Sequence, residues 1–165
     1  MAQDIINKNN LENAIELRLQ KNPQNIINGI LQPSDRFAAS VCNPPFFKSH
    51  ADALNATQNK WKGLGRSDDS TVRNFGGTPT ELCYAGGEKA FLHNYLYESS
   101  QHKLQCFWFT SLVSNIQHVR SMETSLKKLG ATEIKVIEMS RGNKISRMVA
   151  WTFLTKAQQK EWQKK

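Results

Sequence analysis

The sequence is poor in the features that mark secreted and metal-binding proteins. It has only three cysteines, Cys42, Cys83 and Cys106, which lie far apart and form no C-x-x-C pair. That spacing predicts neither a disulfide framework nor a zinc site. The four histidines also lack the short, regular spacing of metal ligands. We therefore expect no metal centre.

Long apolar stretches are missing as well. No run reaches the length of about 18 apolar residues that spans a bilayer, and the N-terminus lacks the basic-then-apolar pattern of a signal peptide. At 165 residues with 39% hydrophobic content, the chain is long enough to bury the core of one domain. These observations predict a soluble protein of the cytoplasm.

Acidic residues are scarce beside basic ones. The chain has 14 Asp and Glu against 22 Lys and Arg, a net charge of +8 and a pI near 9.5. Lys and Arg neutralise phosphates and release condensed counterions, so this surplus favours an anionic partner, above all a nucleic acid. The alternative is that the charge serves solubility alone.

The most informative stretch is an apolar run that ends in Asn43-Pro44-Pro45-Phe46. Residues 37–42 predict a buried strand, and the two prolines end it because they neither donate to a ladder nor continue a helix. The Asn43 amide oxygen and the fixed Pro44 carbonyl would then stand at the carboxyl edge of a sheet, where α/β proteins bind ligands. Two acceptor oxygens followed by the Phe46 ring suit a planar base with an exocyclic amine.

This motif resembles the Asn-Pro-Pro-Phe/Tyr signature of S-adenosylmethionine-dependent amino-group N-methyltransferases. A simpler interpretation also exists. Pro44-Pro45 after a strand forms a rigid turn in many proteins, and Phe46 and Phe47 would then pack as core.

The remaining patterns predict alternating strands and helices. The expected strands are 14–19, 37–42, 105–109, 133–139 and 146–153, and the expected helices are a short one ending at the Asn9-Asn10 pair, 88–99, one from the hydroxyl caps Thr110, Ser111 and Ser114 to Leu129, and 156–165. Gly130 should end the helix before it. Residues 48–80 are polar and glycine-rich, which predicts a long loop.

Several ordered segments together resemble one family, the large-subunit (23S) ribosomal RNA adenine-N6 methyltransferases. The segments are 41–46, 74–77 with 81–82, 86–88, 108–114 and 146–153, with weaker agreement at 17–20 and 28–30. The resemblance spans nearly the whole chain. It implies an α/β fold, namely the C-terminal part of a Rossmann-like class I methyltransferase domain, with strands 3 to 7, an antiparallel last strand, and the first two strands missing.

The resemblance also implies a cofactor and a limit on activity. The cofactor is S-adenosylmethionine, contacted here by Asn43 and Gln20. The family's glycine-rich turn after the first strand and the acidic residue that ends the second have no counterpart in this sequence. We therefore expect the chain alone not to catalyse methyl transfer, and to rearrange, or to pair with a missing N-terminal segment or a second chain.

In the reaction that the family implies, Asn43 and the Pro44 carbonyl accept the two N6 hydrogens of adenine. The nitrogen is thereby drawn towards tetrahedral geometry and its lone pair is aimed at the methyl donor without a general base. Pro45 holds the turn and Phe46 stacks on the base. Phe47 forms a second wall or part of the core.

The 48–80 segment combines basic and aromatic side chains. Its basic residues are Lys48, Lys60, Lys62, Arg66 and Arg73, and Trp61 and Phe75 stand among them. This mixture is typical of a flexible loop that grips RNA, the alternative being a disordered polar loop without a partner.

Three functions remain open from the sequence. The first is N6-methylation of an adenine in large-subunit ribosomal RNA. The second is methylation of adenine in DNA, which differs only in the nucleic acid that accepts the methyl group. The third is a non-catalytic RNA-binding remnant of the family, favoured by the absent cofactor loop.

Overall fold

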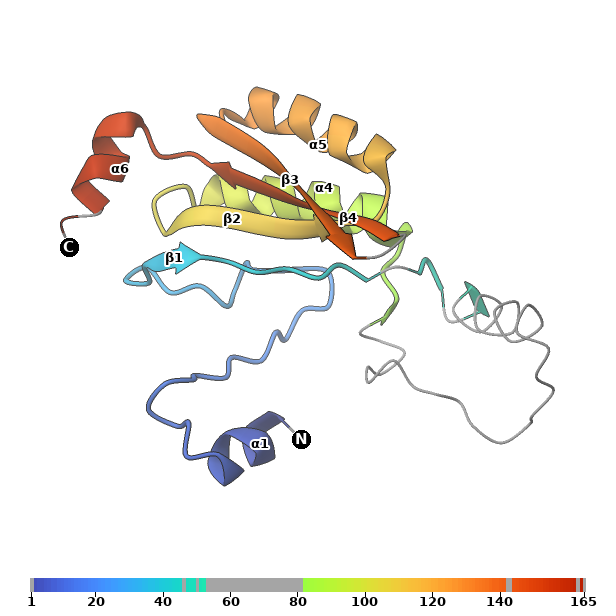
Figure 1. Cartoon of the computed structure of the whole chain (residues 1–165). Helices are drawn as coiled ribbons and strands as arrows, with labels where there is room; N and C mark the ends of the chain where they lie inside the picture. Colours follow the sequence, from blue (N-terminus) through green and yellow to red (C-terminus); the bar gives the residue numbers. More distant parts are fainter. Residues whose placement is uncertain are drawn as a thin grey trace.

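The computed structural model describes residues 2–45, 47–49, 51–52, 82–141, 144–162 and 164. At its centre is a four-stranded sheet in the order β1-β2-β4-β3 (Figure 1). The strands are β1 Phe37–Ala39, β2 Cys106–Val113, β3 Glu133–Arg141 and β4 Lys144–Thr152. β1 runs parallel to β2, whereas β2–β4 and β4–β3 are antiparallel. The expected α/β class with a reversed final strand is confirmed.

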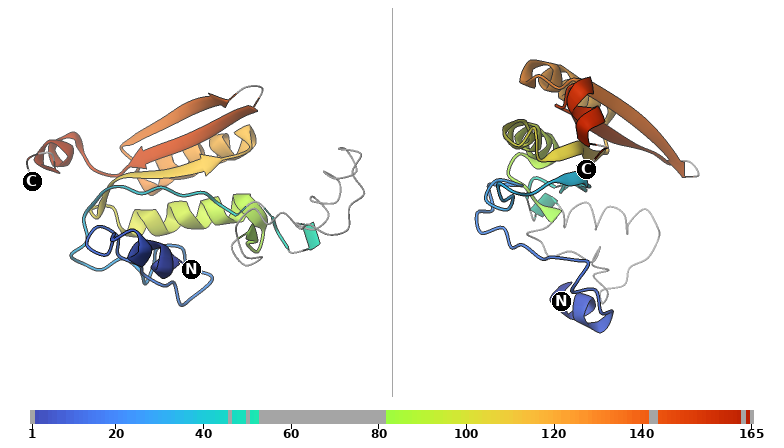
Figure 2. Two further views of the ribbon diagram at one scale, coloured as in Figure 1. Left: turned by 60° about the horizontal axis from the view of Figure 1, so that its bottom comes forward. Right: turned by 90° about the vertical axis from the view of Figure 1, so that its left-hand side faces the viewer.

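Two long helices cover one face of this sheet. They are α4, Gly87–Gln101, and α5, Ile116–Leu129, which lie side by side behind the strands (Figures 1 and 2). The short helices α1, Ala2–Lys8, and α6, Lys156–Trp162, lie at the two ends of the chain. None of the described helices has both the length and the apolar character needed to cross a bilayer.

The start of α5 corrects the sequence prediction. Thr110 and Ser111 do not cap a helix, because β2 continues to Val113 in register with β4 and buries both hydroxyls inside the sheet. The helix is capped instead by Asn115, whose side-chain oxygen accepts from the N–H of Gln117 at 2.9 Å. Gly130 ends the helix as predicted, with φ of 88°.

The core lies between the sheet and these two helices, and aromatic rings dominate it. Phe109 of β2 stacks on Trp151 of β4 with ring centroids 6.0 Å apart, and Tyr95 of α4 meets Trp151 edge-on at 5.4 Å. The Trp151 indole N–H donates to Ser99 Oγ at 3.0 Å, so this fully buried ring leaves no donor unsatisfied. Phe109, Val149 and Trp151 thus occupy the inner face of the sheet.

The strand predicted at 14–19 does not form. Residues 15–20 are irregular, and Leu19 is 86% exposed. In the part of the chain that the structure describes, this segment pairs with no strand, and without a ladder its backbone has no reason to stay extended. Arg18 instead pairs with Asp35 and Glu16, and the guanidinium holds the pKa of both carboxyls below their usual values.

A buried carboxylate fixes the irregular segment that leads towards β1. Glu98 of α4 is 2% exposed and accepts from the backbone N–H groups of Ile26, Ile27 and Asn28 at 2.7–3.0 Å. Asn94, one turn earlier, donates to the same carboxylate at 3.1 Å. This contact joins parts of the chain about seventy residues apart and places residues 26–28 against α4.

Replacing Glu98 by Ala should lower the free energy of unfolding by about 3 kcal/mol, because three buried or half-buried N–H groups lose a charged acceptor. Urea unfolding measures the change, with the exposed Glu161→Ala in α6 as the matched control. Amide exchange at Ile26–Asn28 should accelerate in the Glu98 variant alone. Equal stability of the two variants would contradict the role assigned to this carboxylate.

Candidate functional site

The candidate site begins where β1 stops. Beyond Ala39 the chain stays attached to β2, since the Ser40 N–H donates to the Trp108 carbonyl and the Leu112 N–H donates to the Cys42 carbonyl, both at 2.9 Å. Ser40 is also tied through its hydroxyl, which lies 2.6 Å from the Tyr95 hydroxyl. Burial raises the pKa of Tyr95, so this phenol stays protonated beside Ser40.

A second anchor lies a few residues further on. Phe47 forms an isolated parallel bridge with Cys83: its N–H donates to the Leu82 carbonyl at 3.1 Å, and its carbonyl accepts from the Tyr84 N–H at 3.0 Å. Phe47 is half-buried. Its backbone is therefore part of a small ladder, and residues 43–46 span the gap between two fixed points.

The motif residues occupy different environments within that span. Asn43 is exposed, Pro44 is buried and Pro45 is half-buried, whereas Phe46 lies outside the described residues. Asn43 thus follows the last residue of β1 by four positions and directly precedes the buried Pro44. A role for its side chain in binding a ligand stays a prediction.

The glycines at the start of α4 serve to pack the chain against itself. Gly86 and Gly87 have φ of 85° and 70°, and a Cβ atom on Gly87 would lie 2.8 Å from Cγ of Lys48. The close approach anticipated for this pair is thus made to the residue after Phe47, which adds a third contact to the motif segment.

A polar cluster that the sequence reasoning missed joins α4 to the end of β2. Glu88, 7% exposed, accepts from the N–H and hydroxyl of Ser114 at 2.8 and 2.5 Å, and His118 Nδ1 lies 2.8 Å from the same carboxylate. The sequence signal that could have predicted this cluster is the Gly86-Gly87-Glu88 segment. It places an acidic residue in the first turn of a helix, where free backbone N–H groups lie nearby. The cluster fixes two neighbouring carboxyl-edge loops relative to each other.

One of the two residues predicted to contact S-adenosylmethionine is hydrogen-bonded within its own loop. The Gln20 amide donates to the Asn28 carbonyl at 2.9 Å and accepts from the Asn22 N–H at 3.0 Å. The space beside Gly87 is filled by Lys48, and that beside Gly86 by Ala90. Asn43, the other predicted contact, is exposed, and contact of either residue with the cofactor stays a prediction.

The structure describes only some of the residues that were predicted to contact RNA. Lys48 is exposed and lies beside the Asn43–Phe46 motif. Lys60, Lys62, Arg66 and Arg73 lie outside the described residues, as does most of the 48–80 segment. Of the five, the described part of the chain includes only Lys48, and a contact of any of them with RNA stays a prediction.

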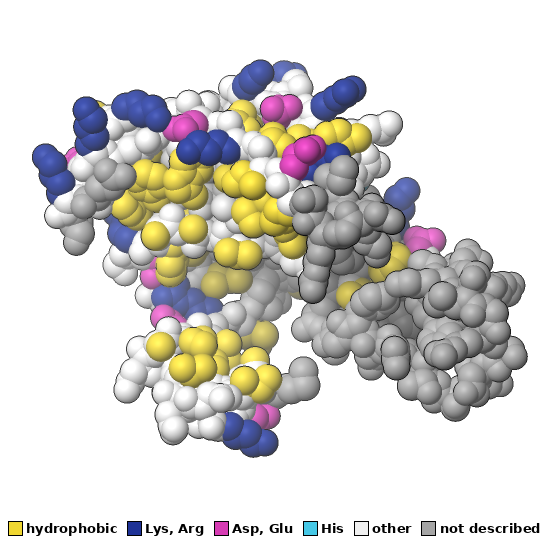
Figure 3. All heavy atoms as spheres, in the orientation of Figure 1, with side chains coloured by type: hydrophobic (Ala, Val, Ile, Leu, Met, Phe, Trp, Pro, Cys, Tyr) yellow, Lys and Arg dark blue, Asp and Glu magenta, His cyan; other side chains and the backbone are white. Residues whose placement is uncertain are grey.

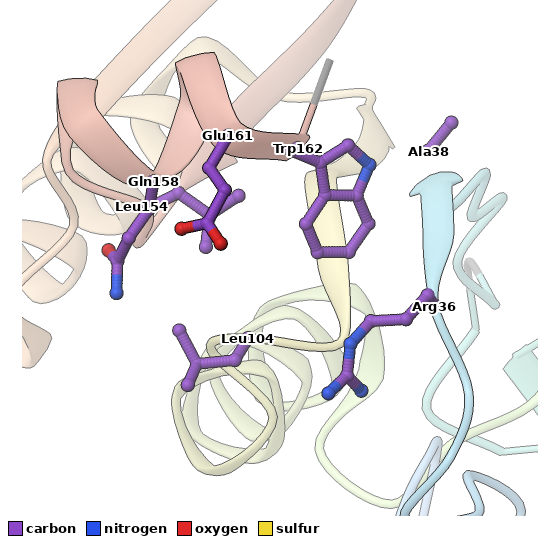
Figure 4. Close-up of a pocket in the computed structure, with 7 residues that line it drawn as sticks. All are labelled: Arg36, Ala38, Leu104, Leu154, Gln158, Glu161 and Trp162. Atoms are coloured by element: carbon purple, nitrogen blue, oxygen red, sulfur yellow. The ribbon is translucent and has the colours of Figure 1, made fainter. Parts of the chain in front are cut away.

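A cavity of about 540 Å³ lies at the opposite end of the sheet. Its lining includes Arg36 and Ala38 at the start of β1, Leu104 just before β2, and Trp162 of α6 (Figure 4). Since Asn43 follows Ala38 by five residues of nearly extended chain, the two places are about 15 Å apart. This cavity is not the acceptor pocket.

A mixed sheet of four strands backed by two helices defines an α/β domain. Solved structures share this fold. The human Mettl16 catalytic domain in complex with an RNA hairpin superposes with a TM-score of 0.69 at 22% identity, covering 94% of this chain and 52% of that one. The N-terminal domain of human METTL16 in complex with SAH gives 0.60 at 18% identity, covering 93% and 47%.

Sequence comparison identifies the family. The family described as RNA methyltransferase matches residues 1–155, and the chain belongs to it. Relatives named Ribosomal RNA large subunit methyltransferase F include one from Pseudomonas fluorescens, 42% identical over 99% of this chain and 49% of its own length. Another, from Pseudomonas savastanoi, is 46% identical over 95% of the chain and likewise 49% of its own length. The chain thus spans about half the length of these relatives.

Substitution of Glu88 by Ala should loosen the link between α4 and the end of β2. We expect the free energy of unfolding to fall by about 2 kcal/mol, because the N–H and hydroxyl of Ser114 lose a charged acceptor that is itself buried. Glu88→Gln should have a smaller effect, and the exposed neighbour Lys89→Ala almost none. Chemical unfolding and amide exchange at Ser114 test this order, and unchanged exchange in Glu88→Ala would refute the link.

The thiol of Cys42 reports on the burial of the backbone next to Asn43. Burial raises its pKa from 9.0 to about 11. Because only the thiolate reacts, alkylation of Cys42 should rise about tenfold per pH unit from pH 8 to 10 without levelling off. In urea-unfolded chain the rate should level off above pH 9.0, the ordinary pKa. Mass spectrometry of iodoacetamide-treated protein measures both rates, and a native plateau near pH 9 would contradict the burial.

Proposed function

We propose that this chain takes part in N6-methylation of an adenine in large-subunit ribosomal RNA, a reaction of the cytoplasm. The observation that carries the proposal is the exposed amide of Asn43 at the carboxyl edge of β1, immediately before the buried Pro44. The names of the relatives support ribosomal RNA as the substrate. The net charge of +8 suits an RNA partner.

In this proposal Asn43 Oδ1 and the Pro44 carbonyl accept the two hydrogens of the adenine N6 amine. The free amine is planar because its lone pair is delocalised into the ring, and acceptance of both hydrogens favours the pyramidal form that can attack a methyl group. The anchors at Ser40 and Phe47 hold these oxygens in place before the base arrives, which lowers the entropic cost of alignment. Phe46 stacks on the base and Lys48 contacts phosphate.

S-adenosylmethionine would supply the methyl group, in keeping with the family and with the SAH in the METTL16 complex. The glycine-rich turn and the acidic residue by which the family holds this cofactor have no counterpart in the sequence. We expect this chain alone to show no methyl transfer and no micromolar binding of S-adenosylmethionine by calorimetry, while retaining weak, salt-sensitive RNA binding.

The role of Asn43 can be tested in a chimera in which this chain replaces the matching half of the Pseudomonas fluorescens relative. Asn43→Ala should lower the rate of labelled methyl transfer to ribosomal RNA by about 100-fold, because it removes an interaction used mainly in the transition state. RNA affinity should change by no more than about threefold. The matched control is the exposed Asn13→Ala.

The same assay decides between substrates and roles. The product should be N6-methyladenosine by mass spectrometry, and DNA of the same sequence should accept no methyl group. Phe46→Ala should weaken RNA binding and rate together, since stacking holds the base in both states. Near-normal turnover by Asn43→Ala would contradict the role proposed for Asn43 Oδ1 as an acceptor of the adenine amine.

A further inference from the structure

The net charge of the chain comes from one part of the sequence. Residues 103–165 contain twelve Lys and Arg against four Asp and Glu, whereas residues 1–102 contain ten of each. The second part alone therefore accounts for the net charge of +8. In Figure 3, Lys and Arg side chains gather at the end of the molecule that carries α6, on the left of the view. Charge concentrated in this way creates a local positive field, which charge spread evenly for solubility does not.

Three of these basic residues lie at the end of α5. Lys127 and Lys128 are in its last turn, and Lys103 Nζ donates to the Leu129 carbonyl at 3.1 Å. All three lysines are exposed. The carboxyl end of a helix carries about half of one negative elementary charge. Three ammonium groups therefore exceed what this helix end can balance.

Two more lysines lie beside the start of β3. Glu133, the first residue of this strand, accepts from Lys156 Nζ of α6 at 2.5 Å and lies 3.3 Å from Lys135 Nζ. The Thr132 hydroxyl donates to the Leu154 carbonyl at 2.7 Å, which places the start of α6 against the start of β3. The end of α5, the start of β3 and the start of α6 thus lie at the same end of the sheet (Figure 1).

The five lysines share one short stretch of chain, because each belongs to residues 127–135 or bonds to a residue of that stretch. Glu133 is the single acidic residue within the stretch. Together with Glu123, one turn before the end of α5, and the helix end itself, it offsets about half of the five positive charges. We call the five lysines the basic end: Lys103, Lys127, Lys128, Lys135 and Lys156.

Two lysines of the basic end lie over aromatic rings. Lys135 Nζ is 4.7 Å from the ring centroid of Trp108, and Lys103 Nζ is 5.2 Å from that of Phe153, which is 5% exposed. Cation–π contacts of this kind hold the ammonium groups in place. A nucleic-acid base cannot stack on the ring faces that these lysines cover. The chemistry offered here is therefore positive charge for phosphate groups, and not recognition of bases.

We propose that the basic end binds the phosphate backbone of ribosomal RNA at a place separate from the target adenine. Lys103 lies just before the start of β2, and Asn43 lies beside the other end of this strand, next to Leu112. The two places are thus about 20 Å apart, a distance that a large folded RNA can span. Phosphate contacts orient an RNA without reading its sequence. The proposal takes RNA as the partner from the proposed function and adds a second contact to it.

The 165-residue chain and an RNA duplex of arbitrary sequence test the proposal. The duplex has about 16 base pairs, the length that a duplex-binding domain spans. Fluorescence anisotropy gives Kd between about 50 and 200 mM KCl. The triple variant Lys127→Gln, Lys128→Gln, Lys156→Gln should bind about tenfold more weakly at the lower salt concentration, and the slope of log Kd against log salt should fall by about two. Absence of duplex binding by the unchanged chain at the lower salt concentration would overturn the proposal.

A matched triple variant separates the position of the charges from their number. It carries Lys8→Gln, Lys21→Gln and Lys89→Gln, at three exposed positions of the first 102 residues. Its Kd should stay within about twofold of that of the unchanged chain, although it loses the same three charges. Equal losses in the two triple variants would overturn the proposal, because net charge alone would then explain the binding. Thermal unfolding checks that each variant is folded.

A variant that gains affinity cannot owe its effect to unfolding. Glu133→Gln removes the carboxylate that lies between Lys135 and Lys156. It should tighten duplex binding about threefold, because both ammonium groups become available to phosphate. The exposed Glu12→Gln makes the same change of net charge elsewhere and should leave Kd unchanged. Unchanged or weaker binding by Glu133→Gln would contradict the proposal.

An acidic protein is the other polyanion that five lysines could bind. Competition by poly-glutamate as strong as that by RNA of equal charge would overturn the proposal in favour of such a protein. Asn43→Ala should leave duplex binding unchanged, because this side chain lies at the other end of β2. None of these measurements uses methyl transfer, so failure of the proposed reaction would leave the result readable.

Discussion

The structure depends on the contact between Phe109 and Trp151. These rings stack between β2 and β4, and Tyr95 meets Trp151 from α4, so one cluster joins two strands and a helix. Aromatic rings bury more apolar area than other side chains, and the antiparallel pairing on either side of the cluster fixes the register. The position of β1, and therefore of Asn43, follows from the position of β2.

Short polar contacts connect the candidate site to this core. The hydroxyl of Ser40 links β1 to Tyr95 of the core, while Glu88 links the start of α4 to Ser114 after β2. Between these contacts the chain presents a single exposed amide, that of Asn43. The backbone on either side of Asn43 is thus attached to the sheet and to the segment before α4.

The sequence predicted those parts whose cause is local. Gly130 ends α5 because its φ of 88° suits glycine. The strand predicted over 37–42 is correct at its start but ends at Ala39, so the prolines that follow Asn43 do not end it. The strand predicted at 14–19 failed because a strand needs a partner, and no property of these residues reveals whether one is present. The prediction that Thr110 and Ser111 cap a helix is wrong, because the pattern of hydroxyls does not reveal that β2 extends to Val113.

The site was predictable to the same extent. Asn43 follows from a motif, whereas the link from Glu88 to Ser114 crosses 26 positions and appears only once both elements are placed. The Gln20 amide, predicted to contact a cofactor, is hydrogen-bonded to Asn22 and Asn28 in this structure, which the sequence does not reveal. Side chains with several nearby partners are where sequence reasoning is weakest, because the choice among partners depends on tertiary geometry.

The parallel pairing of β1 with β2 also has a consequence for the order of folding. β2, α5, β3 and β4 follow one another closely, so their contacts close short loops, whereas Phe37 pairs with Cys106 across almost seventy positions. Contacts between distant positions form later because they close a longer loop at a greater entropic cost. The segment around Asn43 is thus expected to be the last part of the sheet to assemble on a nascent chain. Lengthening the chain between β1 and α4 would raise the entropic cost of that step only as the logarithm of the loop length, so the position of β1 beside β2 is compatible with a long connection.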